Sequence, residues 1–279
     1  MATILPFVFE AAKACVSGDQ PKMPALFVGH GTPMNAIEDN VFSDEWKRLG
    51  REIPRPKAVL CISAHWFIQG TYVTHVSHPK TIHDFGGFPP ELFAVQYPAP
   101  GSPELAVQIH QASVEPKVQL DEKWGLDHGT WSILKHMYPK SDIPVLQLSI
   151  DNQMPPQFHY DLGKRLAALR RQGVLIIGSG NMVHNLRMVD FKRINDVGYG
   201  FDWALEMNDF CKRQILKGDH QPLIDYEKFG KPALLSVPTP DHYYPMLYVL
   251  GLQDKGEAAT LFNDAAVGGA ATMTSIKIG

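Results

Sequence analysis

The chain has 279 residues, of which 44% are hydrophobic and 20% are charged, and its formal net charge is -3. This composition is typical of a globular protein, and so small a net charge favours neither a nucleic acid nor a membrane surface as a partner. The three cysteines are scattered without a CxxC pair, so neither a disulfide framework nor a thiolate zinc site is indicated, and we expect a cytoplasmic protein.

The first 22 residues contain apolar stretches that Glu10 and Lys13 interrupt. No basic start precedes them, and no apolar stretch approaches the ~20 residues that span a bilayer, so we expect neither a secretory signal nor a membrane helix. We interpret residues 1–22 as an N-terminal extension and residues 23–279 as one folded domain.

The first half of this domain alternates strands and helices. The pattern predicts strands at 25–28, 57–64, 71–77 and 118–120 and helices at 40–49 and 103–113. Between them, residues 79–103 form a long irregular segment that carries aromatic residues among prolines. Loops of this length inside a domain are usually functional or disordered, and the aromatic residues favour an ordered wall of an active site.

The second half continues the alternation. It predicts helices at 131–137, 158–171, 201–216 and 246–250 and strands at 143–150, 174–177, 233–237 and 272–278. Such a pattern is typical of an α/β domain whose central, mostly parallel sheet is covered by helices on both faces. Ligands of these folds bind at the carboxyl ends of the strands.

Four histidines each follow an apolar run of strand length, and three of them stand at a glycine- or proline-rich break: His30, His65, His184 and His242. Imidazole is a common ligand of zinc and of non-haem iron, and ligands spread over strand ends suit a catalytic site better than a structural one. Any one of these histidines could instead cap or pack, but the repetition favours a metal site.

Several segments resemble, in order, the 4,5-DOPA extradiol dioxygenase family. They include GHGTPMNAIED, ISAHW, TIHDFGGFP, GLDHGTWSIL, GSGNMVHNLR and PTPDHYYPMLYVLG. This family belongs to the class III extradiol ring-cleavage dioxygenases and is related to the catalytic subunit of protocatechuate 4,5-dioxygenase. The resemblance extends from about residue 23 to residue 279, and it implies that residues 23–279 are an extradiol dioxygenase-like catalytic domain.

The resemblance also implies roles for individual residues. His30, His65 and His242 would hold a metal at the strand ends. His184 would be the acid/base group and could approach the metal as a fourth ligand. His128 could hydrogen-bond to a substrate oxygen, or it could be a helix-entry histidine paired with Asp127.

The implied reaction opens a DOPA-like catechol with O2 beside its two hydroxyls. A phenol has an unperturbed pKa near 10, so its deprotonation near neutral pH needs a metal and a base. Phe85, Phe88 and Tyr97 would form an apolar wall for the ring. The expected partners are therefore a small aromatic substrate and O2, and we expect a monomer or a small homo-oligomer.

The expected cofactor is a divalent metal. The wider class holds Fe2+ with two histidines and a carboxylate, whereas here the third position falls on His242, with Asp241 beside it. Neutral histidines also suit zinc, which binds most such sites more tightly than Fe2+. We expect Zn2+ in the purified protein and Fe2+ as the metal for ring cleavage.

Two other functions remain open at this point. The same ligands and a water molecule could form a zinc-dependent hydrolase. A non-catalytic relative could use the pocket to bind a ligand or a partner. The N-terminal extension lies outside the resemblance, and we expect that its removal spares metal binding.

Overall fold

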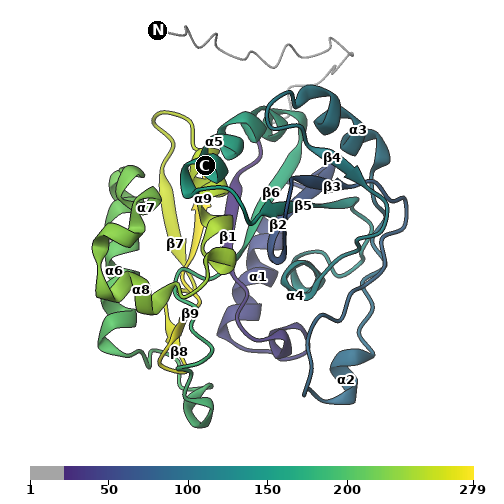
Figure 1. The fold of residues 1–279 in the computed structure, drawn as a ribbon. Helices are drawn as coiled ribbons and strands as arrows, with labels where there is room; N and C mark the ends of the chain where they lie inside the picture. The colour runs from purple at the N-terminus through teal and green to yellow at the C-terminus, as the bar shows by residue number, and fades with distance from the viewer. Residues whose placement is uncertain (1–21) are drawn as a thin grey trace, which may run out of the picture.

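The computed structural model describes residues 22–279 and contains an eight-stranded sheet. This sheet lies at the centre of the domain (Figure 1). The strand order is β4-β3-β5-β2-β6-β1-β10-β7. These strands are β1 (Ala25–Gly29), β2 (Ala58–Ile68), β3 (Tyr72–Thr74), β4 (Gln119–Asp121), β5 (Val145–Asp151), β6 (Val174–Gly180), β7 (Ala259–Phe262) and β10 (Ser275–Ile278). A separate two-stranded sheet pairs β8 (Ala266–Val267) with β9 (Ala271–Thr272).

The four central strands β5, β2, β6 and β1 are parallel to one another. At one side of the sheet, β10 and β7 are added antiparallel, and at the other side β3 is antiparallel to β5. The mostly parallel α/β sheet predicted from the sequence is confirmed. Its parallel centre brings the carboxyl ends of β1, β2 and β6 to one edge.

Both faces of the sheet are buried because alternate residues of each strand point to opposite sides. In β1, Ala25 and Phe27 belong to one apolar cluster, and Leu26 and Val28 belong to the other. The first cluster packs against α3, α5, α6 and α9, and the second packs against α1 and α4. This burial on both faces explains why the central strands are almost continuously apolar.

The helices connect these strands. The α-helices are α1 (Val41–Glu52), α2 (Pro90–Phe93), α3 (Pro103–Ala112), α4 (His128–Met137), α5 (Pro156–Leu166), α6 (Asp202–Lys217), α7 (Gln221–Ile224), α8 (Lys231–Ser236) and α9 (Tyr244–Gly251). The 3-10 helices are η1 (Pro33–Ala36), η2 (Ala167–Gln172), η3 (Phe191–Arg193), η4 (Tyr226–Phe229) and η5 (Pro240–His242). Among the described residues, no helix is both long and apolar enough to cross a membrane.

Three local predictions are wrong. Residues 233–237 were expected as a strand but belong largely to α8, because a short apolar run does not distinguish a buried strand from a helix. The strand predicted to end at residue 64 continues to Ile68, so His65 lies within β2. The short strand β7 was not predicted, because its residues are half-buried or exposed and carry a weak pattern.

The predicted N-terminal extension (residues 1–22) lies outside the described residues except for Lys22. The Lys22 ammonium forms ion pairs with Asp254 and Glu257, each at 2.6 Å. Glu257 also binds the fully buried guanidinium of Arg170 at 2.8 Å. These ion pairs connect the start of the domain to the segment after α9.

Helices α5 and α9 pack closely through glycines. A Cβ on Gly163 would lie 2.2 Å from the carbonyl oxygen of Tyr248, and a Cβ on Gly251 would lie 2.2 Å from that of Tyr160. Real Cβ atoms do not approach backbone oxygens so closely. The two backbones therefore meet at a distance that only glycine permits.

We predict that Gly163→Ala lowers the free energy of unfolding by about 1–3 kcal/mol, because overpacking outweighs the ~1 kcal/mol gain in helix propensity. Urea unfolding measures this change. Gly86→Ala is the matched control, since a Cβ there would meet nothing within 4 Å. A Gly163→Ala protein as stable as the wild type would show that the helices separate without cost.

Candidate metal centre and active site

Five histidines line one cavity at the carboxyl edge of the parallel strands, and we call them the histidine cluster: His30, His65, His128, His184 and His242. His30 directly follows β1, and its backbone N–H donates to the carbonyl of Gly180 at the end of β6 (3.3 Å). His65 lies in β2 where the pairing with β5 shifts register. His128 is the first residue of α4.

The position of His242 depends on Gly180. The carbonyl oxygen of His242 accepts the backbone N–H of Asn181 at 2.9 Å, and a Cβ on Gly180 would lie 2.2 Å from that same oxygen. Helix η5 can therefore pack against the end of β6 only because residue 180 has no side chain. His242 thus reaches the cluster from a 3-10 helix after α8, although a preceding strand was predicted.

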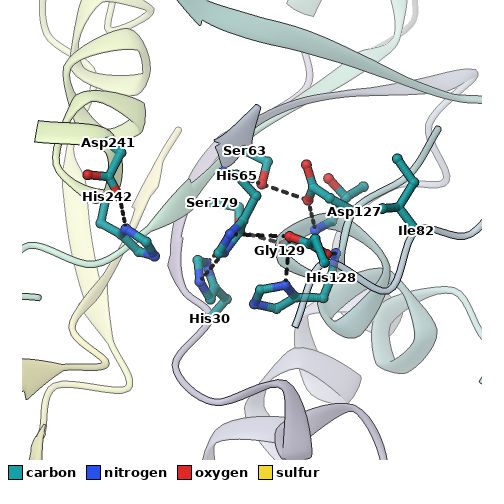
Figure 2. Close-up of polar contacts among 12 residues, drawn as sticks. His30, Ser63, His65, Ile82, Asp127, His128, Gly129, Ser179, Asp241 and His242 are labelled. Atoms are coloured by element: carbon teal, nitrogen blue, oxygen red, sulfur yellow. Dashed lines mark hydrogen bonds and ion pairs between the residues drawn. The ribbon is translucent and has the colours of Figure 1, made fainter. Parts of the chain in front are cut away.

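The rings of the histidines converge on one space, as Figure 2 shows for those that it labels. The centroids of the His30, His65 and His242 rings are separated by 5.0, 5.1 and 5.2 Å. The His128 ring lies 3.9 Å from that of His65, and the His184 ring stacks on that of His242 at 3.5 Å. All five histidines singled out from the sequence therefore come together.

The rings of His30, His65 and His242 each have their Nδ1 atom against another side chain. The pairs are His30 with Ser179 Oγ (2.9 Å), His65 with Asp84 Oδ2 (3.3 Å) and His242 with Asp241 Oδ2. A carboxylate can only accept a hydrogen bond. The Ser179 hydroxyl donates to the carbonyl of Gly129 (2.6 Å), so it too must accept from the imidazole. The His30 and His242 rings therefore carry the proton on Nδ1 and a lone pair on Nε2, and the Asp84 carboxylate beside Nδ1 of His65 favours the same tautomer in that ring.

Nε2 of His30 lies 3.1 Å from Nε2 of His65, and in the favoured tautomers both atoms are acceptors. Two acceptors at this distance repel unless a cation lies between them. Two nitrogens bound to one metal at ~2.0–2.1 Å are separated by ~3.3 Å at a tetrahedral angle and by ~2.9 Å at a right angle. The observed separation lies between these values, and neutral imidazoles suit a divalent transition metal. The residues present therefore fit such an ion.

Two groups of donor atoms can be distinguished within the site. Donors of His30, His65 and His128 lie within 4.8 Å of one another, and so do donors of His184, Asp241 and His242. His242 thus lies between the first group and His184. The carboxylate of Asp241, which stands beside the predicted third ligand, is occupied by Nδ1 of His242.

Burial keeps these imidazoles neutral. It lowers the pKa of His30 and His242 well below 6.5, and the charges of the neighbouring histidines lower both further. Burial also lowers the pKa of His65 to about 3 and that of His184 to about 4. At neutral pH these rings can bind a metal without first losing a proton.

His128 is positioned by Asp84, which comes from the long irregular segment. Nδ1 of His128 lies 3.0 Å from Asp84 Oδ2, and the backbone N–H of His128 donates to Oδ1 (3.0 Å). Burial opposes ionisation of Asp84, but its interactions with His128 and His65 outweigh burial and lower the pKa of Asp84 to about 2. One carboxylate therefore orients two imidazoles.

Asp127 has a different role from the predicted pairing with His128. Its buried carboxylate accepts from Ser63 Oγ (2.7 Å) and Gln147 Nε2 (2.6 Å) and caps α4 by accepting from the N–H of Thr130 (3.2 Å). Burial, with a smaller effect of the Asp84 charge, raises the pKa of Asp127 to about 6. This network fixes the start of α4 against β2 and β5, and thereby places His128.

The cavity beside the histidine cluster has a volume of about 740 Å³. Phe85 and Phe88 line it, as predicted, together with apolar residues that follow β6, including Leu186, Phe191 and Ile194. Tyr97 does not belong to this wall. It is buried, and its hydroxyl donates to the carbonyl of Tyr138 (3.0 Å), so its predicted place in the wall is wrong.

Comparison with known proteins identifies relatives that share the whole domain. Residues 24–268 match the family described as the catalytic LigB subunit of aromatic ring-opening dioxygenase. The chain is 45% identical over 262 residues to the 4,5-DOPA dioxygenase extradiol of Escherichia coli K12, covering 92% of this chain and 95% of the relative. It is 38% identical to the Beta vulgaris protein of the same name, covering 90% and 95%.

A solved structure agrees with the fold. The crystal structure of an uncharacterized protein from Escherichia coli K12 superposes with a TM-score of 0.80 at 42% identity, covering 92% of this chain and 100% of the other.

The α/β sheet carries at its carboxyl edge a histidine cluster that could hold a metal ion. With the family match over most of its length, the chain belongs to the LigB family of aromatic ring-opening dioxygenases. It is an extradiol ring-opening dioxygenase, and enzymes of this class use a divalent metal.

No role was predicted for Ser179, whose sequence context fits neither a nucleophile elbow nor a complete phosphate-binding turn. It contacts His30 only because β6 pairs with β1 in the register that sets Ser179 beside Val28, two residues before His30. On the sequence alone, Asp84 could orient a ligand or form an Asx turn, and the structure places it against two rings.

The lowered histidine pKa values predict that the metal-free protein loses stability as pH falls. The ordinary pKa of His65 is 6.5 and its folded value is about 3, so between these values the unfolded chain binds more protons. The stability is complete above about pH 6.5 and decreases progressively towards about pH 3. Urea unfolding at pH 7.5, 6 and 5 measures the slope.

The variant His65→Asn should show a shallower loss of stability, because one titrating group is gone. The control His78→Asn removes an exposed histidine and should keep the wild-type slope. Equal slopes in wild type and His65→Asn would contradict this account of the cluster.

Proposed function

We propose that His30, His65 and His242 hold one divalent metal through their Nε2 atoms, and that the enzyme opens the ring of a DOPA-like catechol with O2. The observation that carries this proposal is the 3.1 Å separation of the Nε2 atoms of His30 and His65, which matches that of two nitrogens bound to one metal. The ring of His242 is close to both, and all three Nδ1 atoms have protein partners. Such partners fix the orientation of ligating histidines and strengthen their binding.

The metal in the purified protein is proposed to be Zn2+, and the metal that supports ring cleavage Fe2+. A set of neutral imidazoles binds zinc more tightly than Fe2+. When bound, a divalent metal would lower the pKa of the catechol hydroxyls, and Fe2+ would in addition supply electrons to O2. Zinc has no accessible redox change, so it would support substrate binding without ring opening.

His184 is proposed to accept a proton from a catechol hydroxyl. Burial lowers its pKa to about 4, so at neutral pH the ring is uncharged and has a lone pair to offer. Its backbone is fixed on both sides, since its N–H donates to the carbonyl of Ser236 (2.9 Å) and it forms a β-bridge with Ala271. Its ring, stacked on that of His242, lies beside a proposed ligand and could serve as a fourth one.

His128 is proposed to bind the second hydroxyl of the substrate. Its Nδ1 lies 3.0 Å from the Asp84 carboxylate, which can only accept a hydrogen bond and therefore favours the tautomer with a lone pair on Nε2. Nε2 can therefore accept a hydrogen bond from a substrate hydroxyl. Asp84 would keep the ring oriented during this step.

The catechol substrate is proposed from three observations. Relatives named 4,5-DOPA dioxygenase extradiol match 92% and 90% of this chain. The cavity of about 740 Å³ has room for a substituted aromatic ring, and Phe85 and Phe88 offer it an apolar surface.

Loading the protein with Fe2+ under anaerobic conditions, then adding a catechol and O2, tests the function. We expect O2 uptake together with the absorbance of a ring-opened product, and no product when Zn2+ replaces Fe2+. Hydrolysis of an ester or amide substrate by the zinc form, without O2 uptake by the iron form, would contradict the proposal.

The variant His184→Ala separates the two roles proposed for this residue. If His184 accepts a proton, the variant should keep most of its metal and lose about 10²–10⁴-fold in ring cleavage. If it is chiefly a ligand, metal content should fall in proportion to activity. Metal analysis beside turnover of the iron-loaded variant measures both quantities.

The control for this experiment is His78→Ala, which removes an exposed imidazole outside the cavity. It should keep both metal and activity. Full activity with full metal in His184→Ala would remove His184 from the mechanism.

A further inference from the structure

The carboxylates that line the active-site cavity are not balanced by lysine or arginine side chains of the described residues. Among the described residues, the lining contains the carboxylates Glu38 and Asp84 but no lysine and no arginine. Asp84 is already occupied by His65 and His128. Glu38 is therefore the charged side chain in this wall that is left for a substrate.

The Glu38 carboxylate is exposed and has no ion-pair or hydrogen-bond partner within residues 22–279. The nearest cation along the chain, Lys47, binds Asp39 and Asp44 instead. The backbone at position 38 is fixed, since its N–H donates to the carbonyl of Met34 (3.1 Å) and its carbonyl accepts from Ser43 Oγ (2.9 Å). A fixed backbone with a free carboxylate suits a group that binds a cation from the cavity.

A second hollow adjoins the first at this point. It has a volume of about 530 Å³ and is likewise without lysine or arginine among the described residues that line it. The residues common to both hollows are Thr32, Glu38, Ile194, Asn195 and Val267. A side chain attached to an aromatic ring at the histidine cluster can therefore extend past Glu38 into the second hollow.

We propose that Glu38 binds the ammonium group on the side chain of a DOPA-like catechol and determines specificity for it. The inference rests on the proposed function, because it assumes that the catechol ring lies at the histidine cluster. A substrate carboxylate would find no cationic partner in either hollow and would meet Glu38 as a like charge. The amine is thus the recognised group, and a carboxylate on the same side chain is dispensable.

The expected effect is moderate because Glu38 is exposed to water. Exposed ion pairs are weak, and hydrogen bonds to charged groups are stronger, so an ammonium held by Glu38 should bind about 3- to 10-fold more tightly than an uncharged equivalent. The preference should weaken at high salt, because salt screens exposed charges.

Three catechols that differ in the charge at the end of the side chain test this inference. They are dopamine (cationic), 4-ethylcatechol (neutral) and 3-(3,4-dihydroxyphenyl)propionate (anionic). Binding to the zinc-loaded protein is measured by calorimetry, which does not depend on turnover, and kcat/KM is measured for the iron-loaded protein. Wild type should prefer dopamine, then 4-ethylcatechol, then the propionate.

The variant Glu38→Gln should lose about 3- to 10-fold in dopamine binding and in its kcat/KM, leave 4-ethylcatechol unchanged and not weaken the propionate. The control Glu206→Gln makes the same change on α6, outside both hollows, and should keep the wild-type order.

If 4-ethylcatechol binds but charge has no effect, or if Glu38→Gln keeps the wild-type preference for dopamine, this inference is wrong and the proposed function stands. If none of the three catechols binds to the wild type, both the inference and the proposed function are wrong.

Discussion

The metal site depends on one constraint: the Nδ1 atoms of His30, His65 and His242 each lie against a side chain of the protein. Ser179 and Asp241 accept hydrogen bonds from Nδ1 of His30 and His242, and the Asp84 carboxylate lies against Nδ1 of His65, so these contacts direct the Nε2 atoms at the space between the rings. Burial keeps the rings of His30 and His242 neutral, so their Nε2 atoms are available to a metal at neutral pH. A cation between the Nε2 atoms would relieve their mutual repulsion, so this arrangement of the rings favours the binding of a metal.

The sheet provides the framework for this arrangement. The parallel strands β1, β6 and β2 end at one edge, where His30 follows β1, Ser179 stands on β6 and His65 stands in the irregular part of β2. The other histidines of the cluster come from outside the strands, and local contacts fix the positions of His242 and His128. Gly180 admits the carbonyl of His242, and the buried Asp127 network holds the start of α4 and with it His128.

Much of the fold and of the metal site could be predicted from the sequence, because an apolar run followed by a histidine is a pattern of neighbouring residues. This signal was sufficient for His30, His184 and the order of the α/β elements, and the family resemblance supplied the joint role of the histidines. The partners of the rings could not be predicted, since Ser179 is 149 residues from His30 and only the register of β1 with β6 brings them together. The strand expected before His242 is wrong for a different reason: its residues are as apolar as a strand, but they belong to α8, which begins at Lys231 with Pro232 in its first turn.

The central claim is that one metal is bound by Nε2 of His30, His65 and His242. Crystals of the zinc-loaded protein, with anomalous diffraction collected at the zinc edge, test it most directly. The account predicts one strong peak at ~2.0–2.1 Å from all three Nε2 atoms. A peak held by His65 and His128 without His242, or by His184 and Asp241 away from His30, would contradict it.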